Sequence, residues 1–288
     1  MAHSSHRTIA FQGFPGAYSE LASREAFAEH ATLPCTTFED VFAAVEGGAA
    51  SLGMIPIDNS VAGRVADIHH LLPQSTLHII GEHFLPINHQ LLALPGVALT
   101  ELKAISSHVH ALNQCRRLIG ELNLAVRVHA DTAGAAKTLA ESGDRTLGAI
   151  ASTLAAEIYG LQVLRSNIED ASHNTTRFVI VAREPKTPAV GPRPPNSSFM
   201  FGVRNNPAAL YKALGGIAPN GVNITKLESY IGHHFAAAQF YADIEGHPQE
   251  RPVALALEEL HFFAKEVRLL GTYPASPLRQ RWRAGAPL

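Results

Sequence analysis

The sequence predicts an α/β domain over roughly the first two thirds of the chain and a smaller α+β module after it. Short apolar runs, each followed by a helical stretch, recur from Thr8 to about Gly160. Strands that alternate with helices are typical of βαβ units around a mainly parallel sheet. A proline-rich linker at 184–197 then interrupts the pattern. Beyond it the predicted order is β-α-β-β-α-β, the ferredoxin-like motif.

Length and charge exclude several classes of function. The chain has 288 residues and a formal net charge of −2, and a chain of this length is expected to fold as more than one domain. It has no long run of Lys or Arg, so neither nucleic acid nor an anionic membrane is an expected partner. No apolar stretch approaches the ~20 residues of a membrane span. The polar start shows no signal peptide, and we expect a cytoplasmic protein.

Cysteine and histidine spacing argues against a metal site. Only Cys35 and Cys115 are present, which excludes a disulfide framework and a four-cysteine zinc site. The 16 histidines include the spaced pair His108 and His110, but no His-Glu-x-x-His or Cys-x-x-Cys spacing accompanies them. We therefore expect no bound metal.

Polar side chains gather where the predicted strands end. Glycines in the turn from Gly13 to Glu20 would let backbone N–H groups approach an anion. Ligands of open α/β sheets bind outside the carboxyl ends of the strands. Alternatively, these polar residues are only N-caps of helices, for which their residue types are favoured. The candidates for an uncharged anion cradle are Asn59, Ser60, Ser107, Thr132 and Ser152.

Two extended segments predict that the α/β domain is divided. The stretch from His83 to Leu94 is expected to carry the chain from one lobe to another, and the strand after Arg177 to carry it back. This predicts a first lobe of residues 7–82 and 170–183, a second lobe of residues 83–169, and a ligand in the cleft between them. The C-terminal module is expected at 198–276, followed by a mobile tail at 277–288.

The segment from Asn174 to Phe178 places two hydroxyls and a guanidinium just before an apolar run. The planar fork of Arg177 matches a carboxylate, and the hydroxyl of Thr176 can donate a hydrogen bond to an adjacent oxygen. The pair suits a small, oxygen-rich acid. The alternative is a surface strand that begins with a solvated arginine.

Four motifs connect the chain with a known family: Phe11-Gln12-Gly13 with Gly16-Ala17-Tyr18-Ser19-Glu20, Pro56-Ile57-Asp58-Asn59-Ser60, Ser107-His108 with Ala111-Leu112 and Gln114-Cys115, and Thr176-Arg177-Phe178. Over nearly all of residues 7–275 the chain resembles a monofunctional prephenate dehydratase with a C-terminal ACT regulatory domain. The resemblance implies cofactor-free conversion of prephenate to phenylpyruvate, CO₂ and water in phenylalanine synthesis. It also implies a bilobal catalytic domain at 7–183, built like a type II periplasmic binding protein, and a homodimer or homotetramer.

The resemblance implies roles for three consecutive residues. Thr176 matches the catalytic threonine of the family, and we expect it to donate a hydrogen bond to the leaving hydroxyl. We expect Arg177 to bind the pyruvyl carboxylate of the substrate, because an ion pair on the departing carboxylate would oppose decarboxylation. Phe178 is expected either beside the substrate ring or in the core.

The resemblance is incomplete at the effector site of the ACT domain. The family carries Gly-Ala-Leu and Glu-Ser-Arg-Pro there, where this chain has Ala208-Ala209-Leu210 and Glu228-Ser229-Tyr230-Ile231. The alternative is a purely architectural domain, and because the helices cover one face of its sheet, we expect the other face or an edge to be free for pairing with a second copy. The residues that remain for binding L-phenylalanine as an effector are Leu210, Asn223, Glu228 and Ser229.

Two other functions stay open. Arogenate dehydratase acts on a substrate in which an amino group replaces the keto group, and no residue of this sequence decides between the two activities. A non-catalytic amino-acid sensor would use the same cleft without chemistry, and Thr176 beside Arg177 argues against it.

Overall fold

The computed structural model describes residues 7–65, 68–191, 195–204, 206–231 and 237–283. These residues form two compact units. Unit 1 contains His83–Phe178 and the described residues up to Ile68, and unit 2 contains His69–Glu82 and the described residues from Val179 onward. Parts of the predicted linker (192–194) and of the predicted tail (284–288) lie outside the described residues. No helix in the described ranges is long and apolar enough to cross a membrane.

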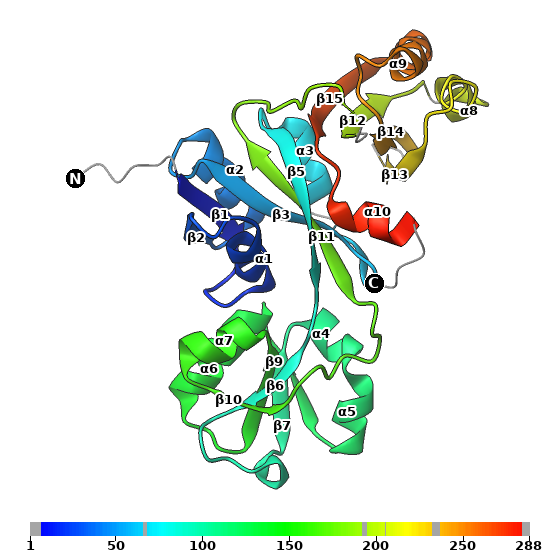
Figure 1. Cartoon of the computed structure of the whole chain (residues 1–288). Coiled ribbons are helices and arrows are strands. Elements are labelled where there is room, and N and C mark those ends of the chain that lie inside the picture. Colours follow the sequence, from blue (N-terminus) through cyan, green and yellow to red (C-terminus); the bar gives the residue numbers. More distant parts are fainter. Residues whose placement is uncertain (1–6, 66–67, 192–194, 205, 232–236, 284–288) are drawn as a thin grey trace. The chain divides into compact units, whose positions relative to one another are not determined.

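The first sheet has six strands in the order β2-β1-β3-β11-β5, with β4 paired to β3. β1 runs parallel to both β2 and β3. Along the chain, α1 connects β1 to β2 and α2 connects β2 to β3, as the colours of Figure 1 show. The boundary between the two units falls inside β5 and β11. The elements are β1 (Thr8–Gln12), α1 (Tyr18–Ala26), β2 (Ala31–Cys35), α2 (Phe38–Glu46), β3 (Leu52–Asn59), β4 (Gly63–Arg64), α3 (Ile68–Gln74), β5 (His78–Pro86) and β11 (Thr175–Ala182).

The second sheet lies within unit 1 and has five strands in the order β10-β6-β9-β7-β8. β7 runs parallel to β8 and β9, whereas β6 runs antiparallel to β9 and β10. Helices cover both faces: Leu112 and Leu118 of α4 and α5 pack in one apolar cluster, and Leu139 and Ala155 of α6 and α7 pack in another. The elements are β6 (Gln90–Ala93), β7 (Ala104–Ser107), α4 (Val109–Gln114), α5 (Arg116–Glu121), β8 (Ala125–Val128), α6 (Thr132–Ser142), β9 (Leu147–Ala151), α7 (Thr153–Tyr159) and β10 (Gln162–Arg165).

These two sheets confirm the α/β class, although the second sheet is mixed and not mainly parallel. The chain leaves the first sheet through β5 and returns through β11, as the two predicted connections require. The likeness to type II periplasmic binding proteins stays a prediction.

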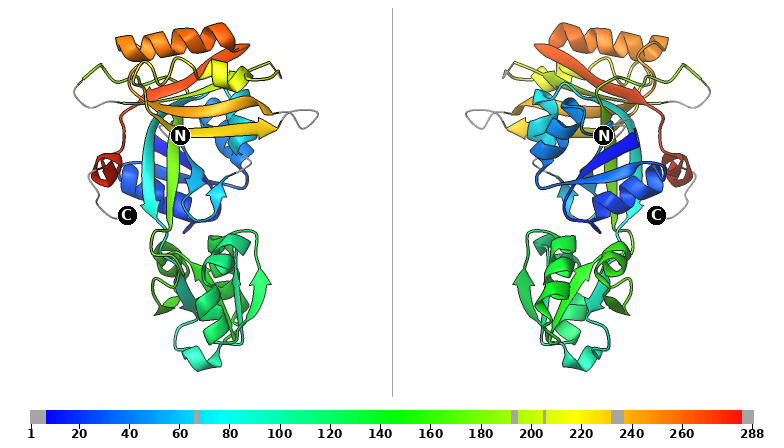
Figure 2. Two further views of the ribbon diagram at one scale, coloured as in Figure 1. Left: turned by 90° about the vertical axis from the view of Figure 1, so that its right-hand side faces the viewer. Right: turned by 90° about the vertical axis from the view of Figure 1, so that its left-hand side faces the viewer.

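Unit 2 contains a four-stranded antiparallel sheet in the order β13-β14-β12-β15. Its elements follow the predicted β-α-β-β-α-β order. Phe199, Phe240 and Leu260 belong to the apolar core between the sheet and its helices, and Figure 2 shows α9 in orange along one face of the sheet. The elements are β12 (Asn196–Gly202), α8 (Ala209–Ala213), β13 (Ile224–Ile231), β14 (Ala237–Glu245), α9 (Arg251–Phe263) and β15 (Glu266–Tyr273).

Side chains on the helix-free face of this sheet are buried, so of the two surfaces expected for pairing, this face and an edge, the edge stays the prediction. Tyr241, Asp243 and Tyr273 are fully buried. The hydroxyls of Tyr241 and Ser198 both donate hydrogen bonds to the Asp243 carboxylate. A buried carboxylate requires such partners, so this face is finished within one chain, and any pairing has to use an edge or the helices.

The predicted mobile tail begins with a helix, α10 (Pro277–Arg283). The guanidinium of Arg279 donates to both oxygens of the buried Glu82 carboxylate at 2.6 and 2.8 Å. The backbone N–H of Ser276 and the amide of Asn196 donate to the same carboxylate. The sequence predicts a mobile tail here because the acidic partner of Arg279 lies 197 residues away and no local pattern indicates it.

β15 lies directly against β5 in unit 2. The guanidinium of Arg268 donates to the carbonyl oxygens of Pro73 and Ser75, and a Cβ built on Gly271 would overlap the carbonyl oxygen of Ile79. The approach of the two backbones therefore depends on a glycine at this position.

We expect Gly271→Ala to lower the free energy of unfolding by about 1–3 kcal/mol, because β15 and β5 would have to separate. Gly120→Ala in α5 is the matched control, since its Cβ would meet no atom within 4 Å and alanine favours a helix. Thermal denaturation of both variants checks this. Equal melting temperatures for the two would contradict the packing described.

Candidate functional site

A cavity of about 550 Å³ lies in unit 1, between elements of the first and second sheets. Gln12 and Asn59 line it from the last positions of β1 and β3. Thr132, at the first position of α6, and His108, the N-cap of α4, line it from the second sheet. Its volume lies within the range of small-molecule sites.

The three consecutive residues at the start of β11 do not share one environment. Thr176 and Phe178 line the cavity, whereas Arg177 does not and is only 6% exposed. Successive side chains of a strand point to opposite faces, so the guanidinium lies on the face away from the cavity. The lining of this cavity does not support the expected role of Arg177 in binding a substrate carboxylate, and that role stays a prediction.

Asn59 determines the direction of the hydrogen bond to Thr176. Its Oδ1 accepts from the backbone N–H groups of Val61 and Ala62 at 3.0 and 2.7 Å, which fixes the orientation of the amide. Its Nδ2 then donates to Thr176 Oγ1 at 2.9 Å and to Asn174 Oδ1 at 2.8 Å. Thr176 is the acceptor, and its own hydroxyl proton remains available to a ligand in the cavity.

This hydrogen-bond network continues to Tyr18. Asn174 Nδ2 donates to Gln114 Oε1 at 3.0 Å, and His89 Nε2 lies 2.9 Å from the same oxygen. The hydroxyl of Tyr18 lies 2.8 Å from His89 Nδ1. Burial lowers the pKa of His89 and raises that of Tyr18, so both side chains are neutral near pH 7. Tyr18, His89 and Gln114 also line the cavity.

Three of the five expected substrate-binding residues do not line the cavity. Ser107 and Ser152 are fully buried; Ser107 donates to a carbonyl of β9, while Ser152 caps α7 and donates to the carbonyl of Gly16. Ser60 donates to the carbonyl of His173 and holds the start of β11. These contacts match the alternative that such residues stabilise the fold, which leaves Asn59 and Thr132 in the cavity.

The cavity also has a cation that the sequence did not suggest. Arg64 is exposed and lines the cavity from β4, where it stands opposite Asp58 in the ladder with β3. A two-residue strand carries no periodicity that a sequence pattern could detect. His108 and His110 line the cavity as well, and burial lowers the pKa of His108. Among the residues that the structure describes, no group of three or more His, Cys, Asp or Glu could hold a metal ion.

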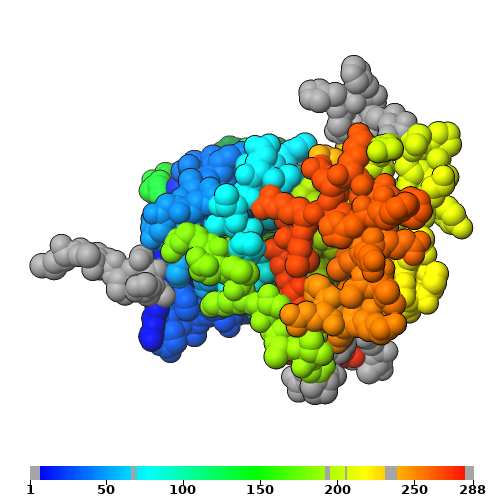
Figure 3. Space-filling view, turned by 90° about the horizontal axis from the view of Figure 1, so that it is seen from above, coloured from blue at the N-terminus to red at the C-terminus, as the bar shows by residue number. Residues whose placement is uncertain are grey.

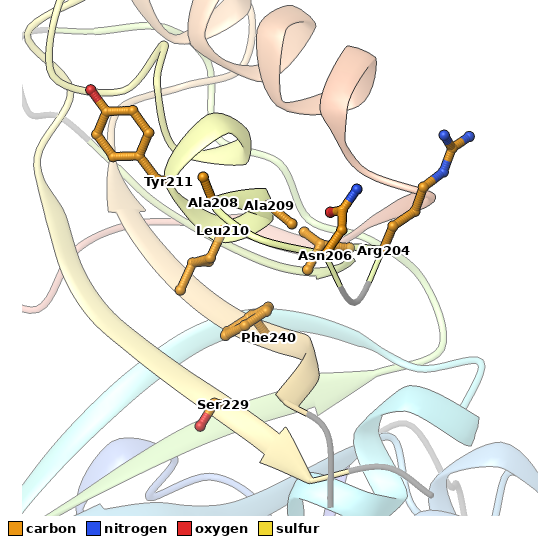
Figure 4. A pocket seen from close by; sticks show the side chains of 9 residues that line it. Arg204, Asn206, Ala208, Ala209, Leu210, Tyr211, Ser229 and Phe240 are labelled. Atoms are coloured by element: carbon orange, nitrogen blue, oxygen red, sulfur yellow. The ribbon is translucent and has the colours of Figure 1, made fainter. Parts of the chain in front are cut away.

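A second cavity, of about 390 Å³, lies in unit 2 and is shown in Figure 4. Leu210 and Ser229 of the expected effector site line it together with Phe240. Ala208, where the resemblance implies glycine, also lines it and has φ of +63°. This left-handed conformation is one that glycine adopts freely and alanine does not.

The other two expected effector residues do not line this cavity. Asn223 donates to the Glu245 carboxylate at 2.9 Å, and the Glu228 carboxylate lies 3.5 Å from the ammonium of Lys226. Both side chains have hydrogen-bond or ion-pair partners within unit 2. These contacts do not support a role for either residue at this cavity.

Comparison with known proteins identifies the family of the chain. The family model for prephenate dehydratase matches residues 9–186. The chain is 51% identical over 283 residues to a bifunctional N-acyl-homoserine lactone acylase/prephenate dehydratase of Komagataeibacter europaeus, covering 96% of this chain and 99% of the relative. It is 40% identical over 286 residues to arogenate dehydratase/prephenate dehydratase 1 of Arabidopsis thaliana, covering 94% and 73%.

A solved structure is also similar to this chain and is of the same kind of enzyme. Prephenate dehydratase of Arthrobacter aurescens in complex with L-Phe is 32% identical, with a TM-score of 0.85 and coverage of 93% of this chain and 89% of that one. The family match spans more than half of the chain, and the relatives match nearly all of it. The chain therefore belongs to the prephenate dehydratase family.

Proposed function

We propose that the protein is a prephenate dehydratase that converts prephenate to phenylpyruvate, CO₂ and water without a cofactor. The observation that carries this proposal is the hydroxyl of Thr176, which lines the cavity and accepts from Asn59, so that its proton is free for a ligand. A leaving hydroxide needs such a donor. The location that we expect is the cytoplasm.

The reaction requires little more than orientation and one hydrogen-bond donor. The electron pair of the bond to the ring carboxylate becomes part of the aromatic ring, CO₂ departs, and the C–OH bond breaks. The departing hydroxide takes up one proton and leaves as water, and solvent replaces that proton. Because aromatisation drives both bond cleavages, the residues have mainly to hold the substrate and assist the poor leaving group.

We assign the pyruvyl carboxylate to the polar side of the cavity. Arg64 supplies a guanidinium there. The departing carboxylate belongs instead near Phe178, Pro56 and Ile87, which line the cavity with apolar atoms. An apolar surrounding favours the loss of charge that accompanies the release of CO₂.

Replacing Thr176 tests the mechanism. We expect Thr176→Val, which keeps the shape and removes the hydroxyl, to lower kcat by about 10²- to 10⁴-fold with a much smaller change in KM. Thr176→Ser is expected to retain most of the activity. Thr138→Val on the exposed face of α6 is the control.

The measurement is the steady-state rate of phenylpyruvate formation from prephenate, with arogenate assayed in parallel by phenylalanine formation. An unchanged kcat for Thr176→Val would remove Thr176 from the mechanism. Turnover of arogenate alone would assign the protein to the sister activity. Binding of prephenate without any turnover would favour the sensor.

Replacing Arg64 tests the carboxylate assignment. We expect Arg64→Ala to raise KM for prephenate by about 10- to 100-fold, the value of a hydrogen bond to a charged group, with a smaller effect on kcat. Arg145→Ala is the control, because Arg145 pairs with Glu101 on the surface. If KM is the same for Arg64→Ala and Arg145→Ala, another group binds the carboxylate.

For the C-terminal module we propose an ACT domain that binds L-phenylalanine in the 390 Å³ cavity. The similar solved prephenate dehydratase that contains L-Phe supports this. Leu210 and Phe240 offer an apolar surface to the ring, and Ser229 offers a hydroxyl to the amino-acid group. The alternative is an architectural domain, which titration calorimetry with L-phenylalanine would reveal by the absence of binding.

The strained backbone of Ala208 gives a separate test of this cavity. We expect Ala208→Gly to raise the free energy of unfolding by about 0.5–1 kcal/mol, because glycine relieves the left-handed conformation. Ala209→Gly is the matched control, since Ala209 begins α8 and glycine weakens a helix by up to about 1 kcal/mol. Denaturant unfolding should therefore shift in opposite directions for these neighbours. A shift in the same direction would contradict the assigned backbone.

A second candidate activity is the hydrolysis of N-acyl-homoserine lactones. The 51% identity to a relative named for both activities favours it, as does the 52% identity, with a TM-score of 0.89, to a solved structure described as a novel type of quorum quenching acylase. Assaying Thr176→Val on both substrates would show whether the two activities share this hydroxyl.

We also propose a homodimer or homotetramer. Leu255 and Phe262 are 41% and 81% exposed on α9, the helix shown in orange in Figure 3. Exposed apolar side chains on one helix support association through that surface. Light scattering on the purified protein measures the number of copies.

A further inference from the structure

The hydrogen bonds between Thr176 and Tyr18 form a continuous chain whose direction is fixed at one end. Asn59 is oriented by two backbone N–H donors, and its Nδ2 therefore faces Oδ1 of Asn174. The Nδ2 of Asn174 must then face Gln114, whose Oε1 is the acceptor and whose Nε2 donates a longer hydrogen bond, of 3.4 Å, to Asn59 Oδ1. Each amide thus fixes the orientation of the next.

The fixed direction requires His89 to act as a donor at Nε2. Gln114 Oε1 already faces the Asn174 donor, so the second contact to this oxygen, from His89 Nε2 at 2.9 Å, is an N–H group. In a neutral imidazole the other nitrogen then carries no proton. Nδ1 is then an acceptor 2.8 Å from the hydroxyl of Tyr18, whose one proton is shared with the carbonyl oxygen of Asn88 at 3.1 Å.

A reversed arrangement of the amides would disturb Thr176. If Gln114 turned its Nε2 toward Asn174, the amide of Asn174 would have to turn as well. Its Nδ2 would then face Nδ2 of Asn59, in place of the present 2.8 Å hydrogen bond from Asn59 Nδ2 to Asn174 Oδ1. Two donors at that distance repel. Because backbone donors hold Asn59 Oδ1, the repulsion would displace the Nδ2 that orients Thr176.

We propose that His89 is a positioning residue for the dehydration, and that its Nε2–H tautomer holds Gln114, Asn174 and Asn59 in the one orientation that leaves the Thr176 proton free. This inference rests on the proposed role of Thr176. It assigns His89 no contact with the reacting atoms.

Burial supports the neutral form that this tautomer requires. His89 is 2% exposed, and burial lowers its pKa, against the opposing effects of the Gln114 hydrogen bond and of Glu169. Glu169 accepts from the backbone N–H of His89 at 2.8 Å, which holds the backbone of this residue. The ring is also in an edge-on contact with Tyr18.

The tautomer is measured first, in the wild-type protein without substrate. The ¹⁵N chemical shifts of the labelled imidazole distinguish a protonated nitrogen from an unprotonated one. We expect a proton on Nε2 and none on Nδ1. A proton on Nδ1 alone would overturn the proposal, whatever the activity of the protein proves to be.

Two substitutions then separate positioning from folding. His89→Gln can place an N–H at the position of Nε2, whereas His89→Asn is too short to reach Gln114. We expect His89→Asn to lower kcat for prephenate by about 10- to 100-fold while KM changes by less than about threefold, and His89→Gln to recover most of that loss. His83→Gln is the control, because His83 pairs with the exposed Glu25 at 3.3 Å.

Two kinetic results would overturn the proposal: an unchanged kcat for His89→Asn, or an equal loss for both His89 variants in folded protein. Absence of all dehydratase turnover in the wild type would instead refute the proposed function. In that case the tautomer measurement still decides whether His89 orients the amides.

Discussion

The candidate site depends on the orientation of one amide. Asn59 accepts two backbone N–H groups through Oδ1 and therefore donates through Nδ2 to Thr176. A threonine hydroxyl can donate one hydrogen bond and accept two, and this contact uses one acceptor position and leaves its proton for the cavity. The strands that bring the two residues together, β3 and β11, are neighbours in the first sheet. The fold thus determines the direction of a hydrogen bond as well as its length.

Unit 2 depends on charges that are buried and compensated. Glu82 receives hydrogen bonds from Arg279, Asn196 and Ser276, and Asp243 receives them from two hydroxyls. An isolated carboxylate in such surroundings would be strongly unfavourable. These contacts explain why the segment after residue 277 is helical and why the helix-free face of the sheet is already covered within one chain.

Some of the expected site residues line the cavity and others do not, and the difference depends on contacts with distant parts of the chain. Thr176, Phe178, Asn59 and Thr132 line the cavity as the sequence predicts. Arg177 does not, because strand alternation places its side chain on the other face. Ser107 and Ser152 form hydrogen bonds to backbone carbonyls far along the chain. Residue type identified the polar residues among them as candidates near strand ends. It could not distinguish a residue that binds a ligand from one that caps a helix.

By itself the sequence determined the alternation of strands and helices and the β-α-β-β-α-β order of the module, because these follow from local periodicity. It also singled out Thr176 as a candidate, through its residue type and the resemblance to a family. Only the tertiary structure decided that Arg64, His89 and Tyr18 join the site, and that Arg177 does not. The reason is physical: which side chains face a cavity, and which donor meets which acceptor, depends on strand pairing between residues more than a hundred positions apart.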